Sequence, residues 1–421
     1  MTGTPRSRGR RDRYAGPRRP VVRGTSLVGQ LVEVEIGPVA HGGFCVARDE
    51  GRVVFVRHTL PGERVRAVVT EGGSEDRFLR ADAVEVLRAA ADRVEPVCRH
   101  AGPGGCGGCD WQHVDLDAQR RLKGAVVAEQ LRRLAGTDRE VEVRPVPGDA
   151  GGLGWRTRVE FAVDAAGRAG LRRHRAHEVI PVTECPIADP RILATGVLTR
   201  GWSGLRALDV VAASAQDGAV VVPVPGTEVP VLHERVAAGS WTGEFEVSAR
   251  GFWQVHPGAA ATLVDRVLDG LAPQPGERVL DLYSGVGLFT AAFADAVGAD
   301  GRVVAVEGDP LACDLARRNV AQRPWVRVIP GRVEDALPDD PVDLVVLDPP
   351  RTGAGRGVVE AIAGLGPRRV AYVACDPAAL ARDLAYAQAV GDELGELTAY
   401  DAFPMTHHVE CIAILRPSAA T

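Results

Sequence analysis

From about residue 246 onward, short apolar segments alternate with longer segments of helical pattern. The apolar segments read RVLDLY, VVAVE, VRVIP, VDLVVLD and RVAYVAC, and the helical ones include LACDLARRNVAQ and PAALARDLAYAQAV. Such alternation is typical of a parallel sheet covered by helices on both faces. It predicts an α/β domain of the doubly wound, Rossmann-like kind over residues 246–421. The last two apolar segments, LTAYDAF and HVECIAIL, are expected to pair antiparallel at the edge of this sheet.

A glycine-containing motif follows the first of these predicted strands. The sequence DLYSGVGLFT occupies residues 281–290, and Glu307 ends the next strand. Gly285 and Gly287 let the backbone come close to a ligand, and a carboxylate at a strand end can accept hydrogen bonds from both ribose hydroxyls. The third glycine of the dinucleotide motif GxGxxG is missing, which favours a smaller adenosine ligand. The pattern indicates a class I methyltransferase that binds S-adenosylmethionine; the alternative is a tight turn with a surface carboxylate.

Two more polar motifs follow later strands. The segment DPPR at 348–351 comes after VDLVVL, and ACDP at 374–377 comes after RVAYV. Ligands of open α/β sheets bind beyond the carboxyl ends of the strands. All four segments are therefore expected to converge on one crevice.

The chain before residue 246 has three regions of different composition. Residues 1–24 carry eight arginines against one aspartate, which predicts a disordered basic arm that can neutralise RNA phosphates, with a solvated tail as the alternative. Residues 25–88 contain short β-branched segments between Gly and Asp turns, which predicts an OB-like barrel that either binds nucleic acid or only packs on its neighbours. Residues 89–245 are expected to form a small, β-rich central domain.

The central domain begins with a cysteine- and glycine-rich segment, CRHAGPGGCGGC. A helix is predicted from Asp117 to Leu134, ended by Gly136. Its apolar stripe is surrounded by basic residues expected to form a solvated face: Arg120, Arg121, Lys123, Arg132 and Arg133. Clustered cysteines indicate a metal site or catalysis rather than disulfides. Four thiolates suit either tetrahedral zinc or an iron–sulfur cluster, and the spacing differs from the CxxxCxxC of a radical S-adenosylmethionine cluster.

Taken together, the motifs resemble those of a known enzyme family. They are CGGCDWQH (106–113), ECPI around Cys185, FWQVH (252–256), DLYSGVGLFT, DPPR, ACDP and DAFPMTHHVE (401–410). In this order they are similar to the RNA 5-methyluridine methyltransferases that carry an N-terminal TRAM domain and a 4Fe-4S cluster. The resemblance covers residues 25–416 and implies that residues 25–88 are the RNA-binding TRAM domain.

The resemblance also implies roles for matching residues. Cys375 is expected to be the nucleophile, with its pKa lowered by the start of the following helix, and Glu410 the base that removes the proton from carbon 5. The residues implied to line the cofactor and base pocket are Gln254, Tyr283, Gly285, Glu307 and Asp348. The implied cluster ligands are Cys98, Cys106, Cys109 and Cys185. Phe252 and Trp253 are candidates for stacking on a base, with core packing expected for one of them. Three positions depart from the family pattern, where asparagine is common: Leu288, Arg332 and Asp376.

These observations predict S-adenosylmethionine-dependent methylation of uracil carbon 5 in RNA, with 23S ribosomal RNA as the expected substrate. Transfer RNA, cytosine methylation and a non-catalytic RNA-binding or RNA-folding protein are the alternatives. The expected cofactors are S-adenosylmethionine and a 4Fe-4S cluster, with zinc as the alternative metal. Because no long apolar run and no apolar leader occur, a cytoplasmic protein without a membrane span is expected. No obligate protein partner is evident.

Overall fold

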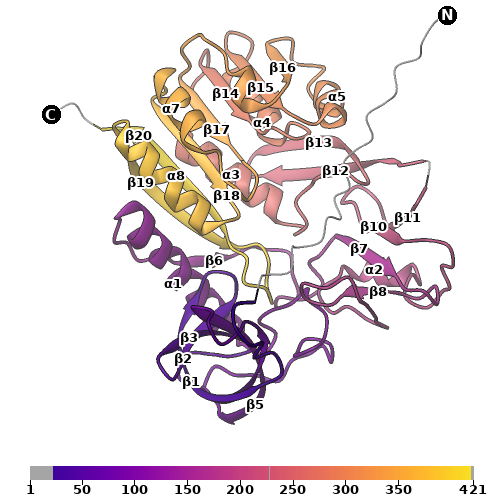
Figure 1. Ribbon diagram of the computed structural model, residues 1–421. Helices are drawn as coiled ribbons and strands as arrows, with labels where there is room; N and C mark the ends of the chain where they lie inside the picture. Colours follow the sequence, from indigo (N-terminus) through magenta and orange to yellow (C-terminus); the bar gives the residue numbers. More distant parts are fainter. Residues whose placement is uncertain (1–21, 227, 419–421) are drawn as a thin grey trace, which may run out of the picture.

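The computed structural model describes residues 22–226 and 228–418 (Figure 1). All but the last three residues of the predicted basic arm 1–24 lie outside this range. In Figure 1 a small barrel lies below a large sheet, and a second, smaller sheet lies to the right of the barrel. No helix in the described ranges is long and apolar enough to cross a membrane.

The N-terminal strands close into a five-stranded barrel with the order β1-β2-β3-β5-β4. Alternate residues of β1 are buried, among them Val32, Val34 and Ile36, because every second side chain of a strand points to the same face. This confirms the predicted OB-like barrel. Its strands are β1 (Leu31–Ala40), β2 (Phe44–Asp49), β3 (Arg52–Arg57), β4 (Arg64–Glu71) and β5 (Phe78–Arg88).

A long helix, α1 (Leu116–Ala135), connects the barrel to the large sheet. Asp115 caps its first turn by accepting from the N–H groups of Asp117 and Ala118. Gly136 ends the helix in the left-handed conformation, as the sequence predicts. One expectation on this helix is wrong. Lys123 is fully buried and pairs with Asp401 instead of lying on a solvated face, since α1 packs against the large domain on the side where Lys123 projects.

The central region forms a five-stranded antiparallel sheet with the order β11-β10-β7-β8-β9. A two-stranded hairpin follows, β12 (Val231–Ala238) and β13 (Trp241–Ser248). Val236 and Phe245 of this hairpin are buried in the same core as the helices of the large domain, so β13 crosses the boundary expected near residue 245. The strands of the sheet are β7 (Arg158–Val163), β8 (Ala169–Arg172), β9 (Val179–Pro181), β10 (Ala207–Val211) and β11 (Val220–Val224). The short helix α2 (Pro190–Ala194) lies between β9 and β10 in the sequence.

The large domain contains an eight-stranded sheet with the order β16-β15-β14-β17-β18-β20-β19-β6. Its first five strands are parallel, and one core covers each face, which confirms the class I methyltransferase fold. The strands are β14 (Arg278–Leu282), β15 (Arg302–Glu307), β16 (Val326–Pro330), β17 (Leu344–Leu347), β18 (Arg369–Ala374), β19 (Asp392–Asp401), β20 (Glu410–Pro417) and β6 (Val143–Pro145).

Helices pack on both faces of this sheet. The β12–β13 hairpin, α3 and α4 share one core, whereas α1, α7 and α8 share the other. The helices are α3 (Ala259–Leu271), α4 (Leu288–Val297), α5 (Pro310–Asn319), α6 (Val333–Ala336), α7 (Arg356–Gly364) and α8 (Pro377–Ala389).

The last two strands, β19 and β20, pair antiparallel as predicted. They do not end the sheet, however, because β6 pairs in parallel with β19. This three-residue strand arrives from the segment after α1, and it is too short to give a sequence signal of its own.

Candidate active site

The carboxyl ends of the parallel strands border a cavity of about 670 Å³. Seven side chains or backbone positions expected to be catalytic or cofactor-binding line this one cavity: Gln254, Tyr283, Gly285, Glu307, Asp348, Cys375 and Glu410. Residues separated by more than 150 positions therefore meet as the strand-end rule predicts. Their roles remain predictions.

The loop after β14 turns sharply toward the end of β15. Tyr283, Gly285 and Gly287 all have positive φ, at 60°, 55° and 91°. The N–H of Gly285 donates to Oε2 of Glu307 at 2.8 Å, and the N–H of Asp309 donates to its Oε1 at 2.7 Å. The Glu307 carboxylate is thus held at the cavity wall by two backbone groups, in a position suited to a ribose.

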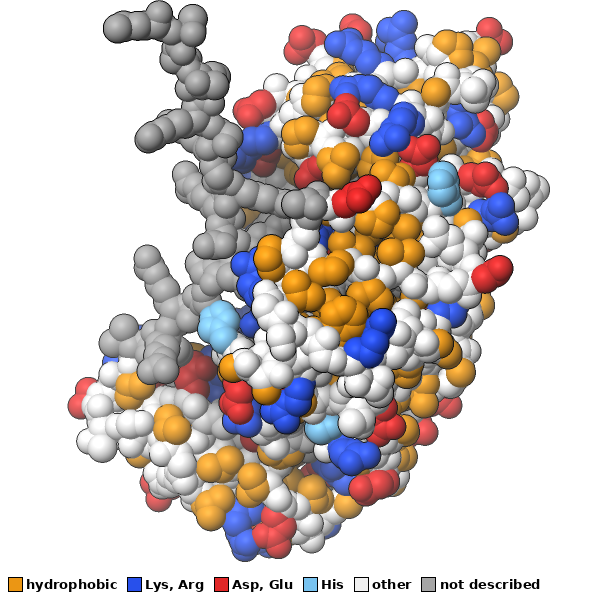
Figure 2. All heavy atoms as spheres, turned by 90° about the vertical axis from the view of Figure 1, so that its right-hand side faces the viewer, with side chains coloured by type: hydrophobic (Ala, Val, Ile, Leu, Met, Phe, Trp, Pro, Cys, Tyr) orange, Lys and Arg blue, Asp and Glu red, His pale blue; other side chains and the backbone are white. Residues whose placement is uncertain are grey.

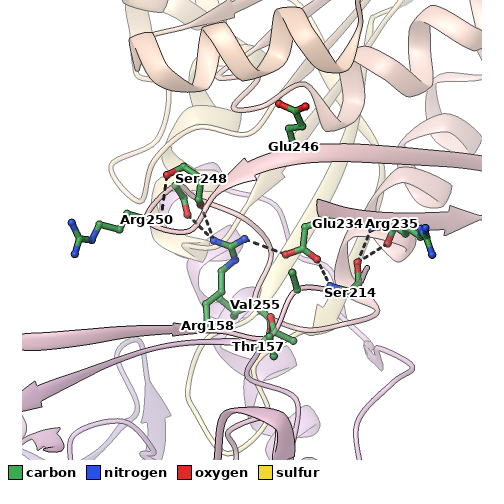
Figure 3. Close-up of polar contacts among 12 residues, drawn as sticks. Thr157, Arg158, Ser214, Glu234, Arg235, Glu246, Ser248, Arg250 and Val255 are labelled. Atoms are coloured by element: carbon green, nitrogen blue, oxygen red, sulfur yellow. Dashed lines mark hydrogen bonds and ion pairs between the residues drawn. The ribbon is translucent and has the colours of Figure 1, made fainter. Parts of the chain in front are cut away.

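A second loop, residues 248–255, is held by the central sheet (Figure 3). Arg158 of β7 donates to the carbonyl oxygens of Ser248 at 3.3 Å and Gly251 at 3.1 Å, and it pairs with Glu234 of β12 at 3.1 Å. The backbone N–H of Thr157 donates to the carbonyl oxygen of Val255 at 2.8 Å. These bonds fix the loop that carries Gln254 into the cavity.

Aromatic side chains of the same loop differ in their surroundings. Trp253 is buried in the core, whereas Phe252 is 73% exposed and lines the cavity. Core packing for one of the two matches the expectation from the sequence. Figure 2 shows hydrophobic side chains gathered over the middle of the face that lies on the right in Figure 1. An exposed aromatic ring beside a cavity suits stacking on a base.

Cys375 and Glu410 lie beside each other. Ala374 of β18 pairs with Cys411 of β20, which places Cys375 and Glu410 one step further along the same antiparallel pair. Glu410 is buried, and burial followed by the charge of Asp348 raises its pKa well above the usual value. Burial also raises the pKa of Asp348 to about 7. This part of the cavity therefore holds protons tightly in the absence of substrate.

The expected lowering of the Cys375 pKa is wrong for the free protein. Burial raises the pKa of this thiol to about 11, and the charges of Glu410, Asp348 and Asp376 act in the same direction, against Arg351 alone. The start of α8 does not outweigh nearby carboxylates in a partly buried setting. A positive charge in the cavity or a protonated carboxylate would favour the thiolate of Cys375.

Arg351 and His408 lie in two of the sequence motifs, but the sequence predicts no role for either residue. Both line the cavity, and the Arg351 guanidinium donates to Nε2 of His408 at 3.3 Å. Burial lowers the pKa of His408 to about 3, so its ring is neutral and accepts this bond. The positive charge of Arg351 lies near the carboxylates and partly offsets the rise in the pKa of Glu410.

The four cysteines expected to bind a cluster line one small cavity of about 40 Å³. They are Cys98, Cys106, Cys109 and Cys185. Burial raises the pKa of Cys106 to about 11 and that of Cys185 as well, so as thiolates they need a positive group among them. Among the described residues, no group of three or more His, Cys, Asp or Glu side chains has the arrangement of a single-ion site. The convergence of four thiols is nevertheless the donor set that an iron–sulfur cluster takes.

The barrel also contributes to the surroundings of Cys375, which the sequence did not predict. His41 lines a cavity of about 180 Å³ together with Cys375, Asp376 and Arg351. A histidine in a glycine-rich turn gives no signal of its own, because only the folded chain brings the turn to this site.

Comparison with known families agrees with this geometry. The TRAM domain family matches residues 25–84, and the tRNA (Uracil-5-)-methyltransferase family matches residues 331–417. The Protein-L-isoaspartate(D-aspartate) O-methyltransferase family matches residues 256–332, which is the part of the fold around the glycine-containing loop.

Similar proteins cover nearly the whole chain. An RNA methyltransferase of Streptomyces coelicolor is 52% identical, over 95% of this chain and 96% of its own length. A protein of Alkalilimnicola ehrlichii named 23S rRNA (uracil(1939)-C(5))-methyltransferase RlmD is 32% identical, over 92% of this chain and 97% of its own. Among solved structures, the Pyrococcus abyssi tRNA (uracil-54, C5)-methyltransferase in complex with S-adenosyl-L-homocysteine shares the fold, with a TM-score of 0.66, 22% identity, and coverage of 91% of this chain and 99% of that chain.

Proposed function

This chain belongs to the S-adenosylmethionine-dependent RNA (uracil-5-)-methyltransferases with an N-terminal TRAM domain, and we propose that it methylates carbon 5 of a uracil in 23S ribosomal RNA through a covalent adduct with Cys375. The observation that carries the proposal is the meeting of Cys375, Glu410 and Glu307 at one cavity. The relative that is 32% identical over nearly its full length, and is named as a 23S ribosomal RNA enzyme, supports the choice of substrate.

The proposed reaction begins with the thiolate of Cys375, which adds to carbon 6 of the uracil and pushes electron density onto carbon 5. Carbon 5 would then attack the electrophilic methyl group of bound S-adenosylmethionine, so that a carbon–carbon bond forms as the methyl–sulfur bond breaks and S-adenosylhomocysteine is the leaving group. Glu410 then takes the proton from carbon 5. The electrons of that C–H bond re-form the 5,6 double bond, and the Cys375–carbon 6 bond breaks to release the thiolate.

The two buried carboxyl groups suit the proton step. The charge of Asp348 raises the pKa of Glu410. When one carboxyl group of this pair is protonated, the other can stay ionised. An ionised Glu410 gains a proton readily, because burial favours its neutral form. The target base must leave its stack to reach this cavity, and Phe252 at the rim offers a ring for it or for a neighbouring base.

An RNA fragment containing 5-fluorouracil tests this mechanism, because fluorine at carbon 5 leaves no proton for Glu410 to remove. With S-adenosylmethionine present, the wild-type protein is expected to form a stable adduct, detected by mass spectrometry on the peptide of Cys375. The Cys375→Ala variant should form none. Cys411→Ala is the matched control, because Cys411 is fully buried on the neighbouring strand and should leave the adduct intact. Methyl transfer by Cys375→Ala would refute the assigned nucleophile.

The choice of RNA is tested by nucleoside mass spectrometry on separated ribosomal and transfer RNA from a strain lacking the gene. We expect 5-methyluridine to be lost from 23S ribosomal RNA and unchanged in transfer RNA. Loss from transfer RNA alone would show that the second candidate substrate is the correct one. An additional loss of 5-methylcytidine would indicate cytosine chemistry.

We further propose that Cys98, Cys106, Cys109 and Cys185 hold a 4Fe-4S cluster, on the ground that they line one cavity. Protein purified without oxygen should contain about four irons per chain and absorb in the visible range. Cys106→Ser should lose the iron, whereas Cys45→Ser, which alters a buried cysteine of the barrel, should retain it. Zinc in place of iron would contradict the cluster and support a structural zinc site.

A further inference from the structure

A side chain of the barrel lies next to the residue that follows Cys375. His41 is in the turn between β1 and β2, and its Nε2 lies 3.2 Å from Oδ2 of Asp376. The two side chains are 38% and 24% exposed. With Cys375 they line the same 180 Å³ cavity, so a barrel side chain that can carry a positive charge lies beside the proposed nucleophile.

The turn that carries His41 is held tightly against the segment 401–410. Gly42 and Gly43 have φ of 93° and 81°, and a Cβ added at Gly43 would lie only 2.9 Å from Cβ of His407. The indole N–H of Trp111 donates to the carbonyl oxygen of Gly43 at 3.3 Å. Close backbone approach and an anchored carbonyl together fix where His41 points.

The structural role of Asp376 as a helix cap favours its charged form. Its carboxylate caps α8 by accepting from the N–H of Ala379 at 2.9 Å. Burial opposes ionisation, but the hydrogen bonds from His41 and Ala379 outweigh it, and the pKa of Asp376 is lowered. An ionised Asp376 works against the thiolate of Cys375. The cap would therefore make the nucleophile less reactive unless another charge offsets it.

We propose that His41 is a positioning residue for methyl transfer, which pairs with Asp376 so that the charge of the helix cap is offset beside Cys375 and the barrel is fixed against the first turn of α8. This inference rests on the proposed function in one respect, the identity of Cys375 as the nucleophile. It links placement of the RNA-binding barrel to the ionisation of the reacting thiol.

The charges around His41 favour its protonated form. The hydrogen bond with Asp376 raises the pKa of His41 above its usual value, burial opposes this, and the charges of Asp376 and Glu129 of α1 add to the rise. As the pH rises through this raised pKa, His41 loses its charge and the offset disappears. The groups that act on Cys375 from the other elements are Asp348, Arg351 and Glu410, and His407 and His408 line the same cavity as His41.

The rate of Cys375 alkylation by iodoacetamide measures its thiolate fraction directly. Trypsin cleaves after Arg369 and Arg382 and so releases Cys375 in a peptide with no other cysteine, which mass spectrometry can quantify between pH 6 and pH 9. Four full-length proteins are compared: wild type, His41→Gln, Asp376→Asn and the double variant. Glutamine keeps a hydrogen-bond donor, and asparagine keeps a helix cap.

We expect His41→Gln to slow alkylation about three- to tenfold at the acid end of the range, as removal of one partly screened charge implies. The ratio of wild-type to variant rates should fall toward one as the pH rises through the pKa of His41 and its ring loses the proton. In the Asp376→Asn background, His41→Gln should have no effect. His233→Gln, which changes an exposed histidine of β12, is the matched control and should match the wild type.

Two results would overturn the proposal. A ratio that does not change with pH would show that His41 acts through structure alone, and an equal effect of His41→Gln with and without Asp376 would show that the pair does not transmit it. Methylation of ribosomal RNA is measured in parallel, with kcat at pH 6.5 expected to fall by the same factor and KM for RNA to stay within about twofold. If the wild type methylates no RNA, the proposed function fails, while alkylation still decides the role of His41.

Discussion

Lys123 is the only lysine in the sequence, and its replacement by methionine tests how the segment 401–410, which ends with Glu410, is anchored. The ammonium of Lys123 pairs with Asp401 and donates to the carbonyl oxygen of Phe403 at 3.0 Å. Both charged side chains are buried, and Oδ2 of Asp401 has no hydrogen-bond partner. Helix α1 is thereby bound to the end of β19, from which the chain runs to Glu410.

Removal of one partner from a buried ion pair costs about 3–5 kcal/mol, because the other charge stays buried without compensation. Methionine fills a similar volume, so Lys123→Met should lower the free energy of unfolding by this amount at pH 8.

Urea unfolding followed by tryptophan fluorescence at pH 8 measures this cost. The double variant Lys123→Met/Asp401→Leu should recover most of the loss, since a matched apolar pair replaces a buried ion pair at little cost. Arg121→Met is the control on the same helix: Arg121 and Asp92 are 61% and 50% exposed, and such a pair is worth at most about 1 kcal/mol. A loss below about 1 kcal/mol for Lys123→Met, or an equal loss in the double variant, would refute this reasoning.

Three further predictions concern Arg158, Asp281 and Glu307. Arg158→Met leaves Glu234 buried without its partner and frees the loop 248–255, so it should lower the free energy of unfolding in urea by about 3 kcal/mol and raise KM for RNA. Arg235→Met, which removes an exposed ion pair on the β12–β13 hairpin, should do neither. Burial raises the pKa of Asp281 to about 7, above the unfolded value of about 3.9. This group therefore makes the wild type lose stability as the pH rises from 4 to 7, and Asp281→Asn should remove up to about 4 kcal/mol of this loss. Parallel pH profiles of stability for the two proteins would contradict this prediction. Glu307→Gln loses a charged acceptor at the proposed ribose position and should weaken S-adenosylmethionine binding about tenfold by calorimetry, with the exposed Glu360→Gln on α7 as the unaffected control.

The predicted strands and helices of the large domain agree with the structure because each has a strong local signal. Buried parallel strands are continuous apolar runs, and capped helices show an apolar period. The short strand β6 and the place of the β12–β13 hairpin have no such signal. A strand of three residues is too short to show a periodic pattern of apolar residues. The residue pattern of the hairpin does not indicate against which hydrophobic core it will pack.

The candidate site was predictable for a related reason. Parallel strands end at one edge of the sheet, so Glu307, Asp348 and Cys375 had to meet there once the strands were identified. The charge state of the thiol was not predictable. A helix start near Cys375 favours the thiolate, but the sequence does not show how many carboxylates the fold gathers around it, and the structure places more negative than positive charge there.

The sequence by itself therefore determined the sheet, its cofactor loop and the residues that reach the cavity, because these depend on periodicity and on the order of segments along the chain. Only the tertiary structure decided what surrounds them. Lys123 is buried because α1 packs on the large domain, and His41 lies beside Asp376 because the barrel folds back against α8. Both contacts join residues more than 250 positions apart, and no local pattern encodes a distance of that kind.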